Sequence, residues 1–316
     1  MQRRTFLYTA GVLGTAALTG CGTTAGKTPE TASPATPATE NDLWFDISLA
    51  QWSLHKAFFA GELDNLDFAS VTRDTFRLGG AEYVSVFFKD RAKDQAYLAQ
   101  MKQRAADNDV RSLLIMVDQE GNLGATDATE RTTAVENHYK WIDAANYLGC
   151  HSIRVNAAGR GSREEVAAAA IDGLRRVSEY GQQAGLNVIV ENHGGYSSDG
   201  GWLAGVIAAT EMDNCGTLPD FGNFCMERGA NGCAEEYDRY RGVREMMPYA
   251  KAVSAKTHDF NEVGDEIHTD YRRMLGIVKE HGYRSWVGVE YEGSSLSEEA
   301  GIRASIALLR RVGAEV

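Results

Sequence analysis

The sequence is poor in several features that mark particular classes of protein. Only 5 of its 316 residues are proline, whereas 43% are hydrophobic and 24% are charged, so a collagen-like or wholly disordered chain is excluded. After its first residues the chain has no run of lysine or arginine, and its formal net charge is −12. Because so acidic a surface repels a phosphate backbone, we expect no nucleic-acid partner. The chain also lacks a CxxC motif, so a thiol-redox or zinc-ribbon role has no support.

The first 21 residues have the pattern of an export signal. Arg3 and Arg4 precede a mostly apolar stretch over residues 10–18, far shorter than the ~20 residues that span a bilayer. The pattern resembles a twin-arginine signal, and Leu18-Thr19-Gly20 before Cys21 resembles a lipobox, in which the cysteine receives lipid. We therefore expect an exported protein that is periplasmic or anchored to a membrane as a lipoprotein. A fortuitous apolar N-terminus is the alternative.

Residues 22–42 differ in composition from the rest of the chain. They are rich in threonine and alanine and hold three of the five prolines, but they contain no large apolar residue. Such a segment buries too little surface to offset the entropy of ordering, so we expect a disordered linker. The catalytic domain is then expected over residues 43–316.

Four cysteines follow the signal. Cys225 and Cys233 enclose a short loop with two glycines and are the more plausible disulfide pair in an exported protein. Cys150 and Cys215 open expected strands, where cysteine more often acts as a small buried hydrophobic residue.

From residue 43 onward, short apolar segments alternate with longer helical patterns. The starts of eight such segments are about 29 to 39 residues apart, a spacing that fits repeated strand–helix units of a parallel sheet. The expected strands are Asp46–Ala50, Tyr83–Phe88, Ser112–Val117, His151–Asn156, Asn187–Glu191, Gly216–Asp220, Ala252–Thr257 and Trp286–Tyr291. Eight units predict an α/β fold, a (β/α)8 TIM barrel. A doubly wound open sheet is the alternative, but residues 51–59 (QWSLHKAFF) lack its glycine-rich phosphate turn.

Three intervening segments have clear helical spacing. Ser162–Gly181 begins with a serine cap and has Glu165 at the position that completes a capping box. Apolar residues also recur at helical spacing in Ala134–Leu148 and Ser297–Val312.

The last four expected strands each end at a side chain that can bind a metal ion. These residues are Glu191, Asp220, His258 and Glu290, and their separations of about 29, 38 and 32 residues correspond to one strand–helix unit each. In a barrel they would converge on the C-terminal rim, where active sites of this fold lie. Three carboxylates and an imidazole suit Mn²⁺, with Mg²⁺, Co²⁺ or Zn²⁺ as alternatives. Helix capping by Asp220 and a purely hydrogen-bonding role for His258 are the structural alternatives.

Together with this spacing, the strings Glu-Asn-His at 191–193 and Asp-x-Gly-Asn at 220–223 resemble the sugar isomerase/epimerase family with the xylose-isomerase-like barrel. The resemblance covers roughly residues 44–316. It implies one divalent metal ion held by Glu191, Asp220, His258 and Glu290, and a small carbohydrate substrate. The family is chemically diverse, so it does not identify the sugar.

Strand alternation then indicates which neighbours share the site. His193 is expected to face the same way as Glu191, and Lys256 the same way as His258. The complete set of expected substrate contacts is His193, Lys256, Asn156, Arg154, Asn223, His55 and Trp52.

These residue types suit the removal of a proton beside a carbonyl group. A metal ion polarises the carbonyl and an adjacent hydroxyl, while a carboxylate on each face, Glu191 and Glu290, moves the proton. The sequence therefore predicts a metal-dependent isomerase or epimerase. The open alternatives are a β-eliminating lyase on 3-keto-glycosides with Lys256 or His193 as acid, a Schiff-base aldolase through Lys256, and a noncatalytic sugar-binding lipoprotein. A DNA-repair nuclease of related fold fits poorly, because the chain has only seven histidines.

Overall fold

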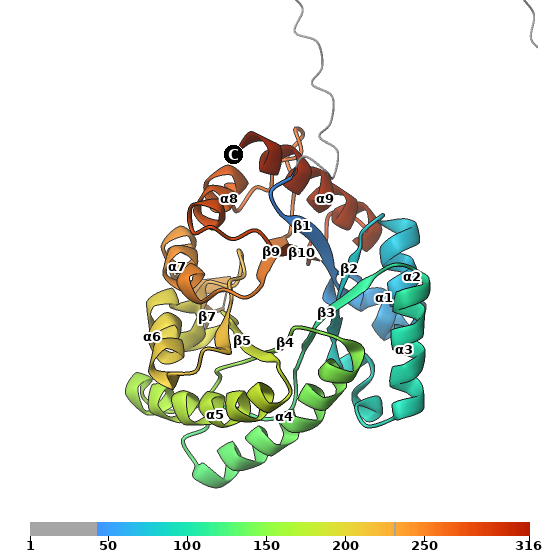
Figure 1. Ribbon diagram of the computed structural model, residues 1–316. Helices are drawn as coiled ribbons and strands as arrows, with labels where there is room; N and C mark the ends of the chain where they lie inside the picture. Colours follow the sequence, from blue (N-terminus) through green and yellow to red (C-terminus); the bar gives the residue numbers. More distant parts are fainter. Residues whose placement is uncertain (1–42, 231) are drawn as a thin grey trace, which may run out of the picture. The chain divides into compact units, whose positions relative to one another are not determined.

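The computed structural model describes residues 43–230 and 232–316 (Figure 1). The expected signal over residues 1–21, with Arg3, Arg4 and Cys21, and the expected linker over residues 22–42 lie outside the described residues. Within the described part of the chain, no helix is both long and apolar enough to cross a membrane.

Eight parallel strands form the central sheet in the order β6-β5-β4-β3-β2-β1-β10-β9. They are β1 Asp46–Ala50, β2 Gly80–Val84, β3 Arg111–Met116, β4 Ser152–Val155, β5 Asn187–Glu191, β6 Cys215–Leu218, β9 Val253–Thr257 and β10 Trp286–Tyr291. Isolated parallel bridges between Thr217 and Ala250 and between Asp220 and Ser254 join the two edges of the sheet. The predicted TIM barrel is confirmed.

Helices surround the strands, as Figure 1 shows. They are α1 His55–Ala60, α2 Phe68–Ser70, α3 Gln95–Asp107, α4 Ala128–Leu148, α5 Arg163–Gln183, α6 Gly200–Thr210, α7 Arg239–Met246, α8 Tyr271–Glu280 and α9 Glu298–Glu315. The capping box expected at α5 is present, because the Ser162 hydroxyl accepts from Glu165 N and the Glu165 carboxylate accepts from Ser162 N. Helix α4 is followed by Gly149, which caps its C-terminus with a φ of 81° that suits glycine.

Alternation along each strand divides the apolar residues into two clusters. In β5, Val188 and Val190 face the outer cluster between strands and helices, whereas Ile189 belongs to the inner one. The inner cluster consists of Ala50, Val84, Leu114, Met116, Ile189, Leu218 and Ala252. Because side chains two residues apart face the same way, Glu191 also faces the barrel interior.

Two features interrupt the regular barrel. Strand β2 begins at Gly80 and ends at Val84, so it starts and ends earlier than the expected Tyr83–Phe88, and a 3-10 turn follows at residues 85–87. After β6, a hairpin of β7 Cys225–Gly229 and β8 Gly232–Glu236 is joined by a Cys225–Cys233 disulfide. Cys150 and Cys215 are buried free thiols, as expected.

Candidate metal centre

Three buried carboxylates meet at the C-terminal end of the barrel. Glu191 ends β5, Asp220 follows β6, and Glu290 lies in β10, one residue before its end. They are 1%, 0% and 3% exposed, and each offers an oxygen within 4.8 Å of the others. We call Glu191, Asp220 and Glu290 the carboxylate triad.

Two buried cations contact the triad. Arg154, from β4, places Nε 2.8 Å from Glu191 Oε2. Lys256, from β9, places Nζ 3.0 Å from Glu290 Oε1 and 3.9 Å from Asp220 Oδ2. Since side chains of both cations are almost fully buried, the ion pairs are shielded from water and depend on their geometry.

Neutral groups complete the shell around the triad. The Ser254 hydroxyl lies 2.7 Å from Asp220 Oδ2 and 3.2 Å from Glu290 Oε2. Asn223 Nδ2 donates to Glu191 Oε1 at 2.8 Å. These contacts leave Glu191 Oε2 without a hydrogen bond, although it lies beside Arg154.

Burial and charge shift the ionisation of the triad. Burial raises the pKa of Glu191; the Arg154 charge opposes this rise and the Glu290 charge adds to it. Burial likewise raises the pKa of Asp220, against the lowering effect of Lys256. Burial alone would lower the pKa of Lys256, but Asp220, Glu290 and Glu292 raise it well above its usual value, so the amine is an ammonium. A raised carboxyl pKa allows proton exchange near neutral pH.

The structure does not bring His258 into this group. Strand β9 ends at Thr257, so the alternation that turns Ser254 and Lys256 inward does not extend to His258. Its half-buried ring instead lies edge-to-face against His268, with 6.1 Å between ring centroids. Of the four expected ligands, the three carboxylates of the triad lie together and His258 does not. The β9 residue that contacts the triad through its hydroxyl is Ser254, which lies near Asp220 and Glu290.

A cavity of about 250 Å³ opens beside the triad and collects most of the expected substrate contacts. Its lining includes Trp52, Arg154, His193, Asn223 and Lys256. On one side it is apolar, because Trp52 lies near Phe87 and exposed Phe59, with ring centroids 6.1 and 6.0 Å away.

Two expected contacts lie behind this lining. Asn156 donates from Nδ2 to Asp118 Oδ1 at 2.9 Å and lines a neighbouring cavity of about 300 Å³ together with His193. His55 stacks on Trp52 at 4.9 Å between ring centroids, and its Nδ1 lies 2.7 Å from Trp52 O.

Sequence reasoning missed three acidic residues of the site. Asp118 follows β3 and accepts from Arg154 Nη1 at 2.8 Å; burial would raise its pKa, but the Arg154 charge lowers it overall. Glu292 follows Glu290 by two residues and lies 2.7 Å from Lys256 Nζ. Glu82, inside β2, is 2% exposed. The sequence signal that indicated Glu191, a carboxylate at the end of an apolar strand, could also have indicated Asp118 and Glu292.

The donor set of the triad fits a divalent cation. Three converging carboxylates are the hard oxygen ligands that Mg²⁺ and Mn²⁺ prefer, and Glu191 Oε2 has a lone pair not used by a hydrogen bond. The cation would have to share Glu290 and Asp220 with the Lys256 ammonium.

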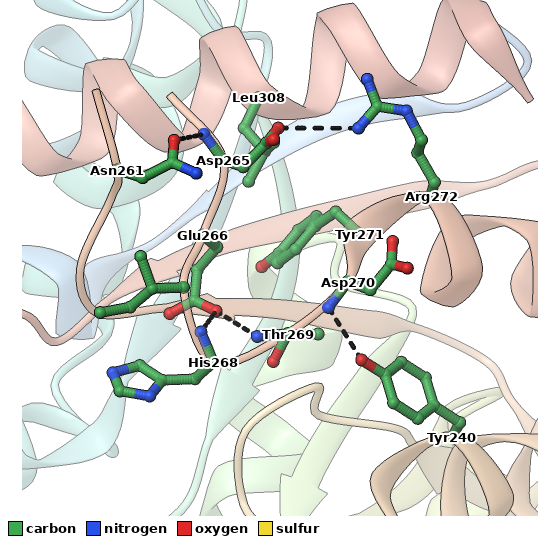
Figure 2. A pocket seen from close by; sticks show the side chains of 11 residues that line it. Tyr240, Asn261, Asp265, Glu266, His268, Thr269, Asp270, Tyr271, Arg272 and Leu308 are labelled. Carbon is green, nitrogen blue, oxygen red and sulfur yellow. Dashed lines mark hydrogen bonds and ion pairs between the residues drawn. The ribbon is translucent and has the colours of Figure 1, made fainter. Parts of the chain in front are cut away.

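A larger cavity of about 550 Å³ lies along the segment between β9 and α8 (Figure 2). None of the triad lines it. Figure 2 shows that its polar groups bond to one another: Glu266 accepts from the amides of His268 and Thr269, and Asp270 N donates to Tyr240 Oη. These contacts order the segment, and the cavity is separate from the candidate metal centre.

Comparison with known proteins agrees with this architecture. A model of the family described as xylose isomerase-like TIM barrel matches residues 76–312. No curated protein shows significant sequence similarity to the chain.

Three solved structures illustrate the structural similarity. The apo form of 3-keto-D-glucoside 4-epimerase from E. coli has a TM-score of 0.66 and 14% identity, covering 84% of this chain and 99% of that one. D-psicose 3-epimerase in the presence of D-fructose has a TM-score of 0.64 and 10% identity, covering 84% and 99%. A magnesium complex from Mycobacterium smegmatis has a TM-score of 0.62 and 14% identity, covering 86% and 98%. At these identities the similarity establishes the fold alone.

Proposed function

Because the chain belongs to the xylose isomerase-like TIM barrel family, we propose that it is an isomerase or epimerase that acts on a sugar or keto-sugar through an enediolate. The observation that carries the proposal is the approach of Glu191 and Glu290. They come from β5 and β10, are buried, and offer oxygens within 4.8 Å of each other beside a cavity. Structures of named sugar epimerases with the same fold support this class of reaction.

Glu191 and Glu290 are the proposed acid/base pair. A hydrogen on a carbon beside a carbonyl is removed by one carboxylate, and a proton is returned to the enediolate at the carbon that changes. Burial raises the pKa of Glu191, so this carboxyl group can hold a proton near neutral pH as well as accept one. Its 2.8 Å contact with Arg154 Nε fixes the direction in which the carboxylate points.

The triad is also the proposed holder of one divalent ion, with Mn²⁺ as the expected metal. When bound, such an ion polarises a carbonyl and an adjacent hydroxyl. Glu191, Asp220 and Glu290 would be its ligands, and we no longer assign this role to His258 because its ring lies against His268.

Neighbouring residues are proposed to orient the sugar. His193, Asn223 and Arg154 present polar groups to the cavity, and Trp52 presents an apolar face on which a sugar ring can pack. Asp118 also lines the cavity and accepts from Arg154, and Asn156 acts one contact further away through its hydrogen bond to Asp118. His55 supports the Trp52 ring from behind.

Solvent deuterium exchange tests the proposal. Full-length protein with Mn²⁺ is incubated in D₂O with a panel of unphosphorylated keto-sugars and 3-keto-glycosides, and products are followed by NMR and mass spectrometry. We expect deuterium at the carbon beside the carbonyl and a product of unchanged skeleton. Glu191→Gln and Glu290→Gln should each reduce exchange by about 10²-fold or more while the fold is kept. Release of an aglycone would instead identify the β-eliminating lyase.

Glu136→Gln provides the matched control. Glu136 is exposed on α4, so the substitution removes a carboxylate at a distance from the triad and should leave exchange unchanged. Wild-type exchange in both Glu191→Gln and Glu290→Gln would contradict the assignment.

We also propose that the protein is exported and carries lipid at Cys21. The support is the order of Arg3-Arg4, the apolar stretch and the lipobox-like residues in the sequence. Mass spectrometry of the N-terminal peptide from the membrane fraction should detect a lipidated cysteine, and Cys21→Ala should remove it. A peptide that retains Met1 would contradict export with processing.

A further inference from the structure

The carboxylate triad already has a cation in contact with it. Lys256 Nζ lies 3.0 Å from Glu290 Oε1 and 3.9 Å from Asp220 Oδ2, and the lysine side chain is 3% exposed. A divalent ion held by the triad would contact oxygens of the same two residues. Because an ammonium and a divalent ion repel each other strongly in a buried site, a bound ion weakens the contact between Nζ and Glu290.

From this geometry we infer that Lys256 is a resident cation of the triad, which a divalent metal ion must displace toward Glu292 in order to bind. The inference rests on the metal-binding part of the proposed function. It assigns Lys256 a role in setting metal affinity, which is distinct from the substrate contact expected from the sequence.

The surroundings of Lys256 provide an alternative position for its ammonium. Nζ is already 2.7 Å from Glu292 Oε1, and the Glu292 side chain is 30% exposed at the rim of the cavity. Asn223 Oδ1, from the segment after β6, lies 3.5 Å from Nζ. A small rotation toward the rim therefore keeps one ion pair while it releases Glu290 and Asp220.

The backbone at Lys256 is fixed, so this movement is limited to the side chain. Lys256 pairs in register with Glu290 between β9 and β10. Its carbonyl accepts from Tyr271 Oη at 2.7 Å. The stem of the lysine passes close to Gly222, where a Cβ would lie 3.0 Å from Lys256 Cγ. Only the outer part of the side chain is thus available to move.

Mn²⁺ titration calorimetry on the chelator-treated full-length protein tests the inference. Lys256→Met removes the competing charge and keeps much of the apolar stem, so the variant should bind Mn²⁺ at least about tenfold more tightly than wild type. Lys251→Met is the matched control, because Lys251 is exposed before the other end of β9 and the substitution changes net charge equally. Its Kd should stay within about twofold of wild type. An unchanged Kd in Lys256→Met would overturn the inference.

A double-mutant cycle with Glu292→Gln identifies the route. If Glu292 acts by receiving the ammonium, Glu292→Gln should weaken Mn²⁺ binding several-fold in the wild-type background and have little effect in the Lys256→Met background. If Glu292 acts only through its own charge, the loss will be equal in both backgrounds, and the proposed displacement toward Glu292 is wrong.

A wild-type crystal soaked in Mn²⁺ keeps the inference testable if Lys256→Met does not fold. The expected map shows Mn²⁺ at the triad and the ammonium at Glu292. Mn²⁺ bound at the triad with Nζ still in contact with Glu290 would overturn it. These readouts measure metal binding, so they stand apart from the isomerase assay. If Lys256→Met binds Mn²⁺ more tightly but the wild-type protein catalyses no exchange on any sugar, only the proposed function is contradicted.

Discussion

Arg154 Nε lies 2.8 Å from Glu191 Oε2, and both side chains are almost completely shielded from solvent. The same guanidinium donates through Nη1 to Asp118 Oδ1 at 2.8 Å. One arginine therefore joins the end of β3 to the end of β5 and supplies a positive charge to the proposed acid/base residue.

Loss of this arginine should change both stability and the pH profile. In Arg154→Met, Glu191 keeps its burial and loses the charge that lowers its pKa, so its pKa should rise further. The part of the pH–rate profile in which exchange speeds up as Glu191 loses its proton should then move to higher pH. The free energy of unfolding at pH 8 should also fall by about 3 kcal/mol. Urea unfolding and the pH dependence of deuterium exchange measure these effects. Arg104→Met, which breaks an exposed pair with Asp67, should lower stability by less than about 1 kcal/mol.

Glu82 should make the stability of the metal-free protein decrease with pH. Burial raises the pKa of Glu82 from 4.5 to about 7, although the Ser48 hydroxyl donates to Oε1 at 2.5 Å. Between these two values the folded state binds the proton more tightly than the unfolded state, so stability falls as pH rises. Glu82→Gln cannot ionise and should be more stable than wild type by up to about 3 kcal/mol at pH 8 in EDTA.

At pH 4 the difference should nearly disappear, because the Glu82 carboxyl is then largely protonated in both states. Denaturant unfolding at several pH values checks this trend. A difference that is constant with pH would show that Glu82 does not titrate in this range.

The disulfide-linked hairpin should affect substrate binding more than the barrel's stability. Arg228, on β7, lines the cavity, while most of the hairpin is exposed. Removing the link in Cys225→Ser/Cys233→Ser should loosen the position of Arg228, so KM should rise several-fold with little change in kcat. Thermal unfolding should shift by only a few degrees, because few buried contacts depend on the hairpin.

Arg228→Gln in the oxidised protein should give the same change in KM. If the serine double variant raises KM and Arg228→Gln does not, the hairpin acts through another residue.

Metal removal should leave the wild-type barrel folded. Lys256 and Arg154 already contact the triad, so its carboxylates are not left unpaired when a chelator is added. EDTA should therefore change the wild-type Tm by less than about 4 °C, as scanning calorimetry or circular dichroism can measure. Unfolding of the protein by EDTA at room temperature would show that the metal is structural.

Much of the barrel was predictable because its strands carry a simple signal. Asp46–Ala50, Asn187–Glu191 and Trp286–Tyr291 have the predicted boundaries. The error at β2 arises from Gly79-Gly80, which resembles a turn. A Cβ on Gly80 would lie 2.7 Å from Leu113 Cδ1 and 2.8 Å from the Trp286 ring, so this glycine serves close packing within the barrel wall.

The site was predictable where a carboxylate ends an apolar strand. That pattern indicated Glu191 and Glu290, and the spacing indicated Asp220. It could not show that β9 ends before His258, so that strand alternation no longer fixes the direction of this side chain. It also could not show that Lys256 would contact two members of the triad, because that depends on the register of β9 against β10.

The barrel closes between β6 and β9 through isolated bridges, and one of these joins Asp220 and Ser254 within the site. The carboxylate triad thus draws residues from both sides of the contact between β6 and β9, where only isolated bridges connect the neighbouring strands. A sugar that contacts residues on both sides would hold β6 and β9 together. Sugar binding should therefore stabilise the closed barrel, and closure of the barrel should favour sugar binding.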